Sequence, residues 1–167
     1  MRHAWLMIPL LVLAGCTGSD GGSGSAEHIS LEVTFPPEVQ PGPQATLVVT
    51  LYGYDPGFAD ASATVIQTDA VPLTATPGMF TIEFPTDAHE RIDQGNGPVA
   101  FEDARYYFVF YGDLDDDRQI CAGELFQDHD NDGPYDFGPG APPETVTIPM
   151  RIVDASFPCR SAYPDGA

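Results

Sequence analysis

Residues 29–35 read ISLEVTF, and their alternation decides the class of fold. Apolar side chains stand at every second position, with serine, glutamate and threonine between them. Because successive side chains of a strand point to opposite faces, this pattern predicts a β-strand with one buried face. The run PPEVQPGPQ, residues 36–44, is rich in turn residues and ends the strand.

The same pattern returns along the chain and predicts an all-β fold. Residues 105–111 (RYYFVFY) are apolar or aromatic on both faces, which favours a central strand covered on both sides. Pro149 indicates an edge or a bulge in the last strand. No stretch keeps a helical period, although residues 87–94 allow one helical turn. The other expected strands are residues 45–52 (ATLVVTLY), 63–68 (ATVIQT), 79–84 (MFTIEF) and 145–153 (TVTIPMRIV).

About seven short strands separated by Pro and Gly turns predict an antiparallel β-sandwich of the immunoglobulin or transthyretin-like kind, with acidic ion-binding loops. Residues 29–112 resemble the small β-sandwich lipoproteins related to the type III secretion lipoprotein chaperone. The segments ISLEVTF, PPEVQPGPQATLVVTLY, FTIEFP and the tyrosine-rich strand carry this resemblance. It implies a sandwich and assigns no functional residue.

The N-terminus has the form of an export signal. Arg2 precedes an apolar run, residues 4–13, that is too short to span a bilayer. The following Leu-Ala-Gly-Cys resembles the lipobox of bacterial lipoproteins, which implies cleavage before Cys16 and lipidation of Cys16. An ordinary secretory signal with an incidental cysteine is the alternative.

These features divide the chain into regions. We expect a signal peptide (1–15), a lipid anchor with a Gly/Ser-rich tether (16–27), a β-sandwich domain (28–160) whose region 112–140 is acidic, and a C-terminal tail (161–167). The expected location is the bacterial cell envelope, lipid-anchored to a membrane and either periplasmic or surface-exposed.

The charge is strongly negative. The chain has 25 acidic residues, six arginines and a formal net charge of −19. Such a surface repels phosphate backbones, so nucleic acid is not an expected partner. The expected partners are cations, basic proteins and an envelope protein.

Residues 112–136 concentrate nine of these carboxylates. The run from Asp128 to Asp136 fits D-x-D-x-D-G-x-x-D, which resembles the calcium loops of EF-hands, dockerins, thrombospondin type 3 repeats and integrin-type repeats. Ca²⁺ takes six to eight oxygen ligands, and alternate carboxylates of a curled loop point inward to supply them. The predicted calcium ligands are Asp128, Asp130, Asp132, the carbonyl of Pro134, and Asp136.

A second acidic run precedes it. Asp113, Asp115 and Asp117 alternate, and Glu124 stands at the twelfth position, which is the spacing of an EF-hand loop. Arg118 occupies the position of the turn glycine, where its charge opposes an ion. The run is either a second, weaker site or completes the coordination of the Asp128 loop. A solvated acidic surface in a salt-adapted chain is the alternative to both sites.

Two cysteines remain besides Cys16. In an oxidising compartment Cys121 and Cys159 are expected to form a disulfide, with a catalytic or metal-binding thiol pair as the alternative.

The sequence carries no G-x-S-x-G, H-E-x-x-H or P-loop motif, and its histidines are isolated, so we expect no enzyme. The predicted function is an envelope-anchored module that binds calcium for structure and for protein interaction. Alternatives are a chaperone or assembly factor that holds a partner subunit, and a ligand- or carbohydrate-binding module with Tyr52, Tyr54 or Tyr106 lining a groove.

Overall fold

The computed structural model describes residues 27–58, 61–73, 79–95, 97–127, 136–139 and 145–163. Two short 3-10 turns, η1 (Pro56–Phe58) and η2 (Ala88–Arg91), are the helical elements of this part of the chain. The strands are β1 (Glu27–Thr34), β2 (Thr46–Tyr54), β3 (Thr64–Pro72), β4 (Met79–Phe84), β5 (Arg105–Asp113), β6 (Gln119–Ile120), β7 (Leu125–Gln127), β8 (Thr145–Ile152) and β9 (Arg160–Ser161).

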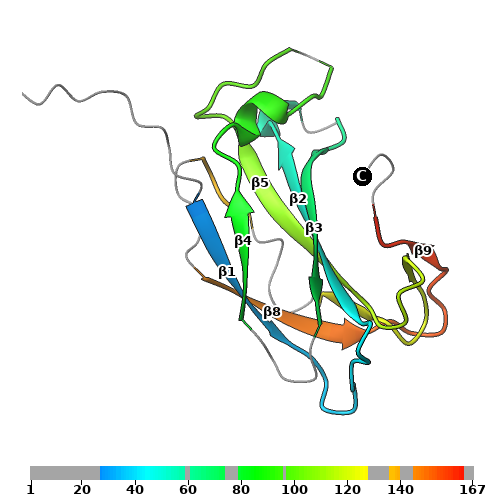
Figure 1. Ribbon diagram of the computed structural model, residues 1–167. Helices are drawn as coiled ribbons and strands as arrows, with labels where there is room; N and C mark the ends of the chain where they lie inside the picture. Colours follow the sequence, from blue (N-terminus) through cyan, green and yellow to red (C-terminus); the bar gives the residue numbers. More distant parts are fainter. Residues whose placement is uncertain are drawn as a thin grey trace, which may run out of the picture.

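Seven strands form one sheet in the order β3-β2-β5-β7-β8-β1-β4, and β6 and β9 form a second, small sheet (Figure 1). The all-β prediction with about seven strands is confirmed. The arrangement differs from a strict antiparallel sandwich, because β1 and β8 pair in parallel and the sheet is nearly closed like a barrel. The side chain of Gln67 on β3 donates to the carbonyl of Glu83 on β4, at 3.3 Å, and so joins the two edge strands.

The core lies inside this curved sheet. The alternation of β1 places Ile29, Leu31 and Val33 in the core with none of their surface exposed. On β5, Phe108 and Phe110 face the same core and are fully buried. Burial of such side chains is the main favourable contribution to folding, at roughly 1.5–3 kcal/mol for each.

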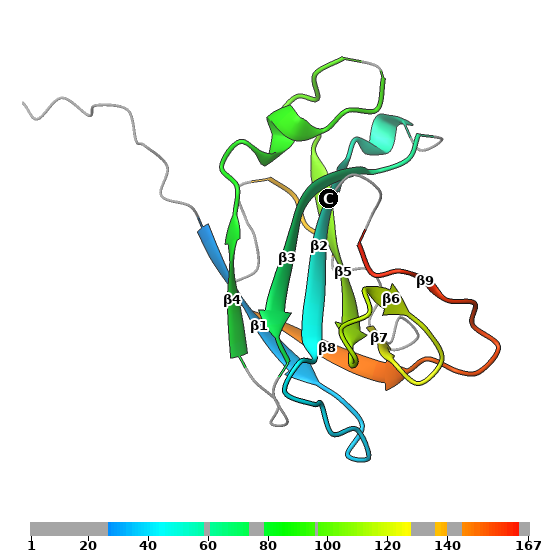
Figure 2. The same cartoon turned by 45° about the vertical axis from the view of Figure 1, so that its right-hand side comes forward.

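Described residues cover the outer face of β2 and β5 at one end. Tyr111 packs there into a second apolar cluster with Val48 and Ile120, whereas Tyr107 is half-buried at the other end. The cover comes from the C-terminal segment, residues 153–163, which places Val153, Phe157, Ala162 and Tyr163 in this second cluster. Figure 2 shows β6 and β9 beside the lower end of β5.

Candidate functional site

The acidic run that begins at Asp113 forms a curled loop, Asp113–Glu124, between the end of β5 and the start of β7. One carboxylate oxygen from each of Asp113, Asp115 and Asp117 lies within 4.8 Å of the others. The alternate spacing therefore brings these three side chains together, as the sequence predicts. Asp113 is buried, and the other two are exposed.

Backbone amides hold the three carboxylates in place. Asp113 accepts hydrogen bonds from the amides of Asp116, at 2.7 Å, and Arg118, at 2.9 Å. The amide of Asp117 donates to Asp115 at 3.2 Å, and the amide of Gln119 donates to Asp117 at 2.7 Å. A carboxylate oxygen has more than one lone pair, so these bonds leave capacity for a cation.

Glu124 closes the loop from the side of the core. Glu124 is 7% exposed, and its Oε1 accepts a hydrogen bond from the amide of Leu114 at 2.9 Å. Its Oε2 is buried and has no hydrogen-bond partner in the described part of the chain. A buried polar atom without a partner costs roughly 1–3 kcal/mol, and more when it is charged.

The electrostatics of the loop also favour a cation. The pKa of Glu124 is raised to about 7, chiefly by burial and also by the charges of Asp113, Asp115 and Asp117, while the hydrogen bond from the Leu114 amide opposes the rise. Ionised Glu124 is therefore unfavourable beside three other carboxylates. A cation would compensate all four charges, so the residues present fit a metal ion.

Arg118 occupies the turn position of the loop, and its guanidinium packs on an aromatic ring. Its φ is +63°, so it adopts the left-handed backbone that favours glycine at this position. Its guanidinium carbon lies 5.2 Å from the ring centroid of Tyr163, and its carbonyl accepts a hydrogen bond from the amide of Ala162 at 2.9 Å. The charge therefore has an aromatic partner outside the loop. Sequence reasoning missed Tyr163, because nothing in the sequence connects it with Arg118.

The loop is joined to the C-terminal segment by covalent and hydrogen bonds. A disulfide between Cys121 and Cys159 is present, at the pairing that the sequence predicts. Gln119 and Ile120 of β6 pair with Ser161 and Arg160 of β9. Order in the loop and order in the C-terminal segment therefore depend on each other.

Of the predicted ligands in the run from Asp128 to Asp136, only Asp136 lies within the described residues. Its Oδ2 accepts a hydrogen bond from the hydroxyl of Tyr54 at 2.6 Å. This bond, with burial and the charge of Asp136, raises the pKa of Tyr54 to about 12. The other predicted ligands of this loop, Asp128, Asp130, Asp132 and Pro134, lie outside the described residues, as does Cys16, so calcium binding there and lipidation stay predictions.

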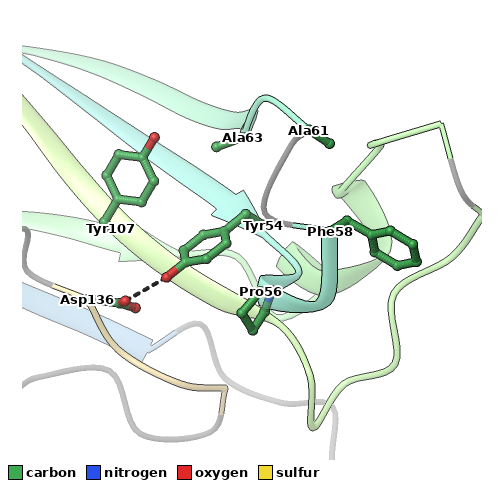
Figure 3. A pocket seen from close by; sticks show the side chains of 7 residues that line it. All are labelled: Tyr54, Pro56, Phe58, Ala61, Ala63, Tyr107 and Asp136. Carbon is green, nitrogen blue, oxygen red and sulfur yellow. Dashed lines mark hydrogen bonds between the residues drawn. The ribbon is translucent and has the colours of Figure 1, made fainter.

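A hollow of about 410 Å³ lies at the open end of the β2–β5 outer face (Figure 3). The ring centroids of Tyr54 and Tyr107 are 6.0 Å apart, and Tyr107 is stacked on Tyr52 with centroids 5.1 Å apart. Tyr106, a predicted groove residue, is instead in the core at 1% exposure. Alternation along residues 105–111 could have identified Tyr107, since it faces away from Tyr106. The lining residues are Tyr54, Pro56, Phe58, Ala61, Ala63, Tyr107 and Asp136.

Comparisons with known proteins add little to this description. No protein-family model and no curated protein matches the sequence. Among solved structures, an alternative pilotin from the type II secretion system of Vibrio cholerae is similar, with a TM-score of 0.46 and 20% sequence identity over 78% of this chain and 100% of the pilotin chain. A likeness of this extent carries no argument about function. Within the described residues, no helix has the length and apolar character needed to cross a membrane.

Proposed function

We propose that this protein is a non-enzymatic, envelope-anchored β domain that binds a calcium ion in the loop Asp113–Glu124. The observation that carries the proposal is the buried Glu124, whose Oε2 lacks a partner beside three gathered aspartates. The aspartates and Glu124 would supply the side-chain oxygens. The ion would supply positive charge that removes the repulsion among them.

The donor set fits calcium better than other common metals. All four side chains offer carboxylate oxygens, which hard cations prefer. Cys121 is in a disulfide and is no thiolate ligand, so the loop lacks the nitrogen and sulfur donors typical of zinc sites. Magnesium usually binds with one or two carboxylates and several waters, so a loop with four carboxylates suits the larger calcium ion.

The ion would act on structure beyond the loop. Since the loop contains β6 and Cys121, its order supports β9 and the C-terminal segment. A ligand that binds only the folded state adds about 2.7 kcal/mol of stability at one hundred times its Kd. Calcium would therefore hold the C-terminal segment in place over one end of the β2–β5 outer face. The C-terminal segment would then be the surface available for protein interaction at that end.

Thermal unfolding and calorimetric titration of the full chain test the calcium site. We expect calcium to raise the Tm above its value in chelator and in sodium chloride of matched ionic strength. Glu124→Gln, which keeps the shape of the side chain, should remove this rise. Glu102→Gln is the matched control, because Glu102 is exposed and lies outside the loop, and it should behave as the unsubstituted protein.

Two results would contradict the proposal. Equal Tm values in calcium and sodium would mean that the carboxylates form a solvated acidic surface. A calcium response that survives in Glu124→Gln and is lost in Asp132→Ala would assign the ion to the Asp128 loop instead.

The membrane anchor is proposed from the Leu-Ala-Gly-Cys sequence that ends at Cys16. Bacteria that express the full chain and are fed a clickable fatty acid should label the protein, and Cys16→Ser should abolish the label. Absence of label from the unsubstituted chain would favour an ordinary secretory signal.

A partner-holding role, as chaperone or assembly factor, is a second candidate. The observation in its favour is the strip of Tyr52, Tyr54 and Tyr107 at the open end of the β2–β5 outer face. Binding of a peptide at this strip, abolished by substitution of Tyr107, would support it.

A further inference from the structure

The hollow at the open end of the β2–β5 outer face is built mainly from aromatic and apolar side chains. The rings of Tyr54 and Tyr107 are inclined at 64° to each other and so form two sides of a corner. Figure 3 shows Ala61 and Ala63 across from Tyr107 and Pro56 near Tyr54, while the ring of Phe58 points away. The pocket therefore offers aromatic faces and a small apolar wall to a ligand.

Among the described residues that line this pocket, Asp136 supplies a carboxylate. Asp136 is exposed, and its Oδ2 accepts the hydroxyl hydrogen bond of Tyr54. Asp55 lies next to the lining residue Pro56, and its carboxylate accepts the amide of Gly57 at 2.7 Å. With a net charge of −19 on the chain, the surroundings repel anionic ligands and attract cations.

Arg105 is a positive group near this end of the strand pair, opposite Tyr54 in the register, and its charge opposes the rise in the pKa of Tyr54. Its Nη1 donates to the carbonyls of Glu102, at 3.1 Å, and Ala104, at 2.8 Å. These bonds hold the guanidinium at the backbone, and Arg105 is not among the lining residues.

The polar groups that line the pocket are too few for a sugar ring. Among the described residues they are two tyrosine hydroxyls and the carboxylate of Asp136, and the hydroxyl of Tyr54 is already bonded to that carboxylate. A sugar needs hydrogen bonds to most of its hydroxyls, because burying an unpaired hydroxyl costs free energy. An organic cation needs aromatic faces and one nearby negative charge.

We propose that this pocket binds an organic cation of the alkylammonium type, either a small molecule or the side chain of a lysine. The faces of Tyr54 and Tyr107 contact the charged group, Asp136 compensates its charge, and Ala61 and Ala63 contact the alkyl part. No residue of the calcium loop Asp113–Glu124 lines this pocket, so the proposal does not depend on the calcium site.

Calorimetric titration of the full chain tests the pocket, in calcium and again in chelator. The probes are choline chloride, N-acetyl-lysine methylamide and a lysine-containing peptide, with glucose and sodium glutamate as comparison ligands. We expect saturable binding of a cationic probe and none of glucose or glutamate. Repeating the titration in chelator separates this result from the outcome at the calcium loop.

Variants of Tyr107 identify the pocket as the binding site. Tyr107→Leu removes the aromatic face and should weaken binding about fivefold or more, whereas Tyr107→Phe keeps the ring and should bind within about twofold of the unsubstituted chain. Phe101→Leu is the matched control, because Phe101 is an exposed aromatic residue, 49% exposed, that does not line the pocket. Circular dichroism of each variant shows whether it has folded. If Tyr107→Leu has not folded, the binding measured for Tyr107→Phe remains as the test.

The probes also distinguish the source of the cation. Preference for choline indicates a small molecule, and preference for the lysine peptide over the lysine amide indicates a protein partner. The proposal is overturned if no cationic probe saturates, if glucose binds in their place, or if Tyr107→Leu binds as tightly as Phe101→Leu.

Discussion

The two ends of the β2–β5 outer face both carry carboxylates, but in different surroundings, and we propose that they bind different cations. At the lower end of β5, the loop Asp113–Glu124 gathers three carboxylates and holds the buried Glu124, and the C-terminal segment covers the neighbouring Tyr111. At the upper end, Tyr54 and Tyr107 line a pocket whose described residues include one carboxylate, that of Asp136. Negative charge is common to both ends, but oxygen ligands select a metal ion whereas aromatic faces select an organic cation. In both proposals, carboxylate charge attracts the cation. The neighbouring ligand atoms or aromatic rings then select a metal ion or an organic cation.

The register of β2 and β5 shows that both ends lie on the same pair of strands. Tyr52 pairs with Tyr107, and Val48 pairs with Tyr111, so the same two strands supply both ends. Tyr111 and Tyr107 differ because β6, β9 and the disulfide fix the C-terminal segment over one of them only. Four sets of substitutions test whether the two ends differ in this way, and they follow in order of expected effect.

Removing the disulfide should have the largest effect. Cys121→Ala with Cys159→Ala opens a link across a sequence separation of 38 residues, for which the chain-entropy relation gives a loss of about 4 kcal/mol in the free energy of unfolding. Urea unfolding measures this loss. Calcium affinity should fall and choline affinity should stay the same. Equal losses of both affinities would show that the two ends are not independent.

Two glycines allow a matched substitution at each end. A Cβ on Gly112 would lie 2.8 Å from the Cβ of Leu125, and a Cβ on Gly53 would lie 2.8 Å from Cγ1 of Ile92. Each Gly→Ala change should therefore lower the free energy of unfolding by about 1–3 kcal/mol in urea titrations. Gly112→Ala should lower calcium affinity more than choline affinity. Gly53→Ala should lower choline affinity more than calcium affinity.

Gly42→Ala is the control for this pair, because a Cβ there meets nothing within 4 Å. Its free energy of unfolding should stay within about 0.5 kcal/mol of the unsubstituted value. A loss as large as that of Gly112→Ala would contradict the steric explanation.

Tyr163→Leu should have a smaller effect. It removes the ring under Arg118, which contributes about 0.5–1 kcal/mol at such exposure, and it frees the guanidinium near the carboxylates. Calcium titration should show weaker binding, while Tyr163→Phe, which keeps a ring, should bind as before. Unchanged calcium affinity in Tyr163→Leu would mean that the ring does not control the position of Arg118.

The smallest effect concerns Tyr54, and its pH dependence lies in the alkaline range. Its pKa rises from 10.0 to about 12 in the folded protein, chiefly through the hydrogen bond to Asp136. The neutral hydroxyl therefore stabilises the fold fully below pH 10, and this contribution is lost as the pH rises toward 12.

Tyr54→Phe removes that contribution. The stability advantage of the unsubstituted protein over Tyr54→Phe should be constant below pH 10 and should shrink between pH 10 and 12. Thermal unfolding across this range measures it, and a constant advantage would contradict the hydrogen bond. Tyr106, whose pKa burial also raises to about 12, is common to both proteins and cancels in the comparison.

The sequence by itself determined the all-β class, because alternation in segments such as residues 29–35 is a local property that needs no knowledge of neighbours. It also predicted that Asp113, Asp115 and Asp117 come together, since alternate spacing acts within one loop. Only the tertiary structure decided the parallel pairing of β1 with β8 and the cover over Tyr111. It also placed Arg118 on Tyr163 and Tyr54 against Asp136. Each of these contacts joins residues far apart in the chain, and the packing of the whole domain, rather than any local preference, brings such residues together.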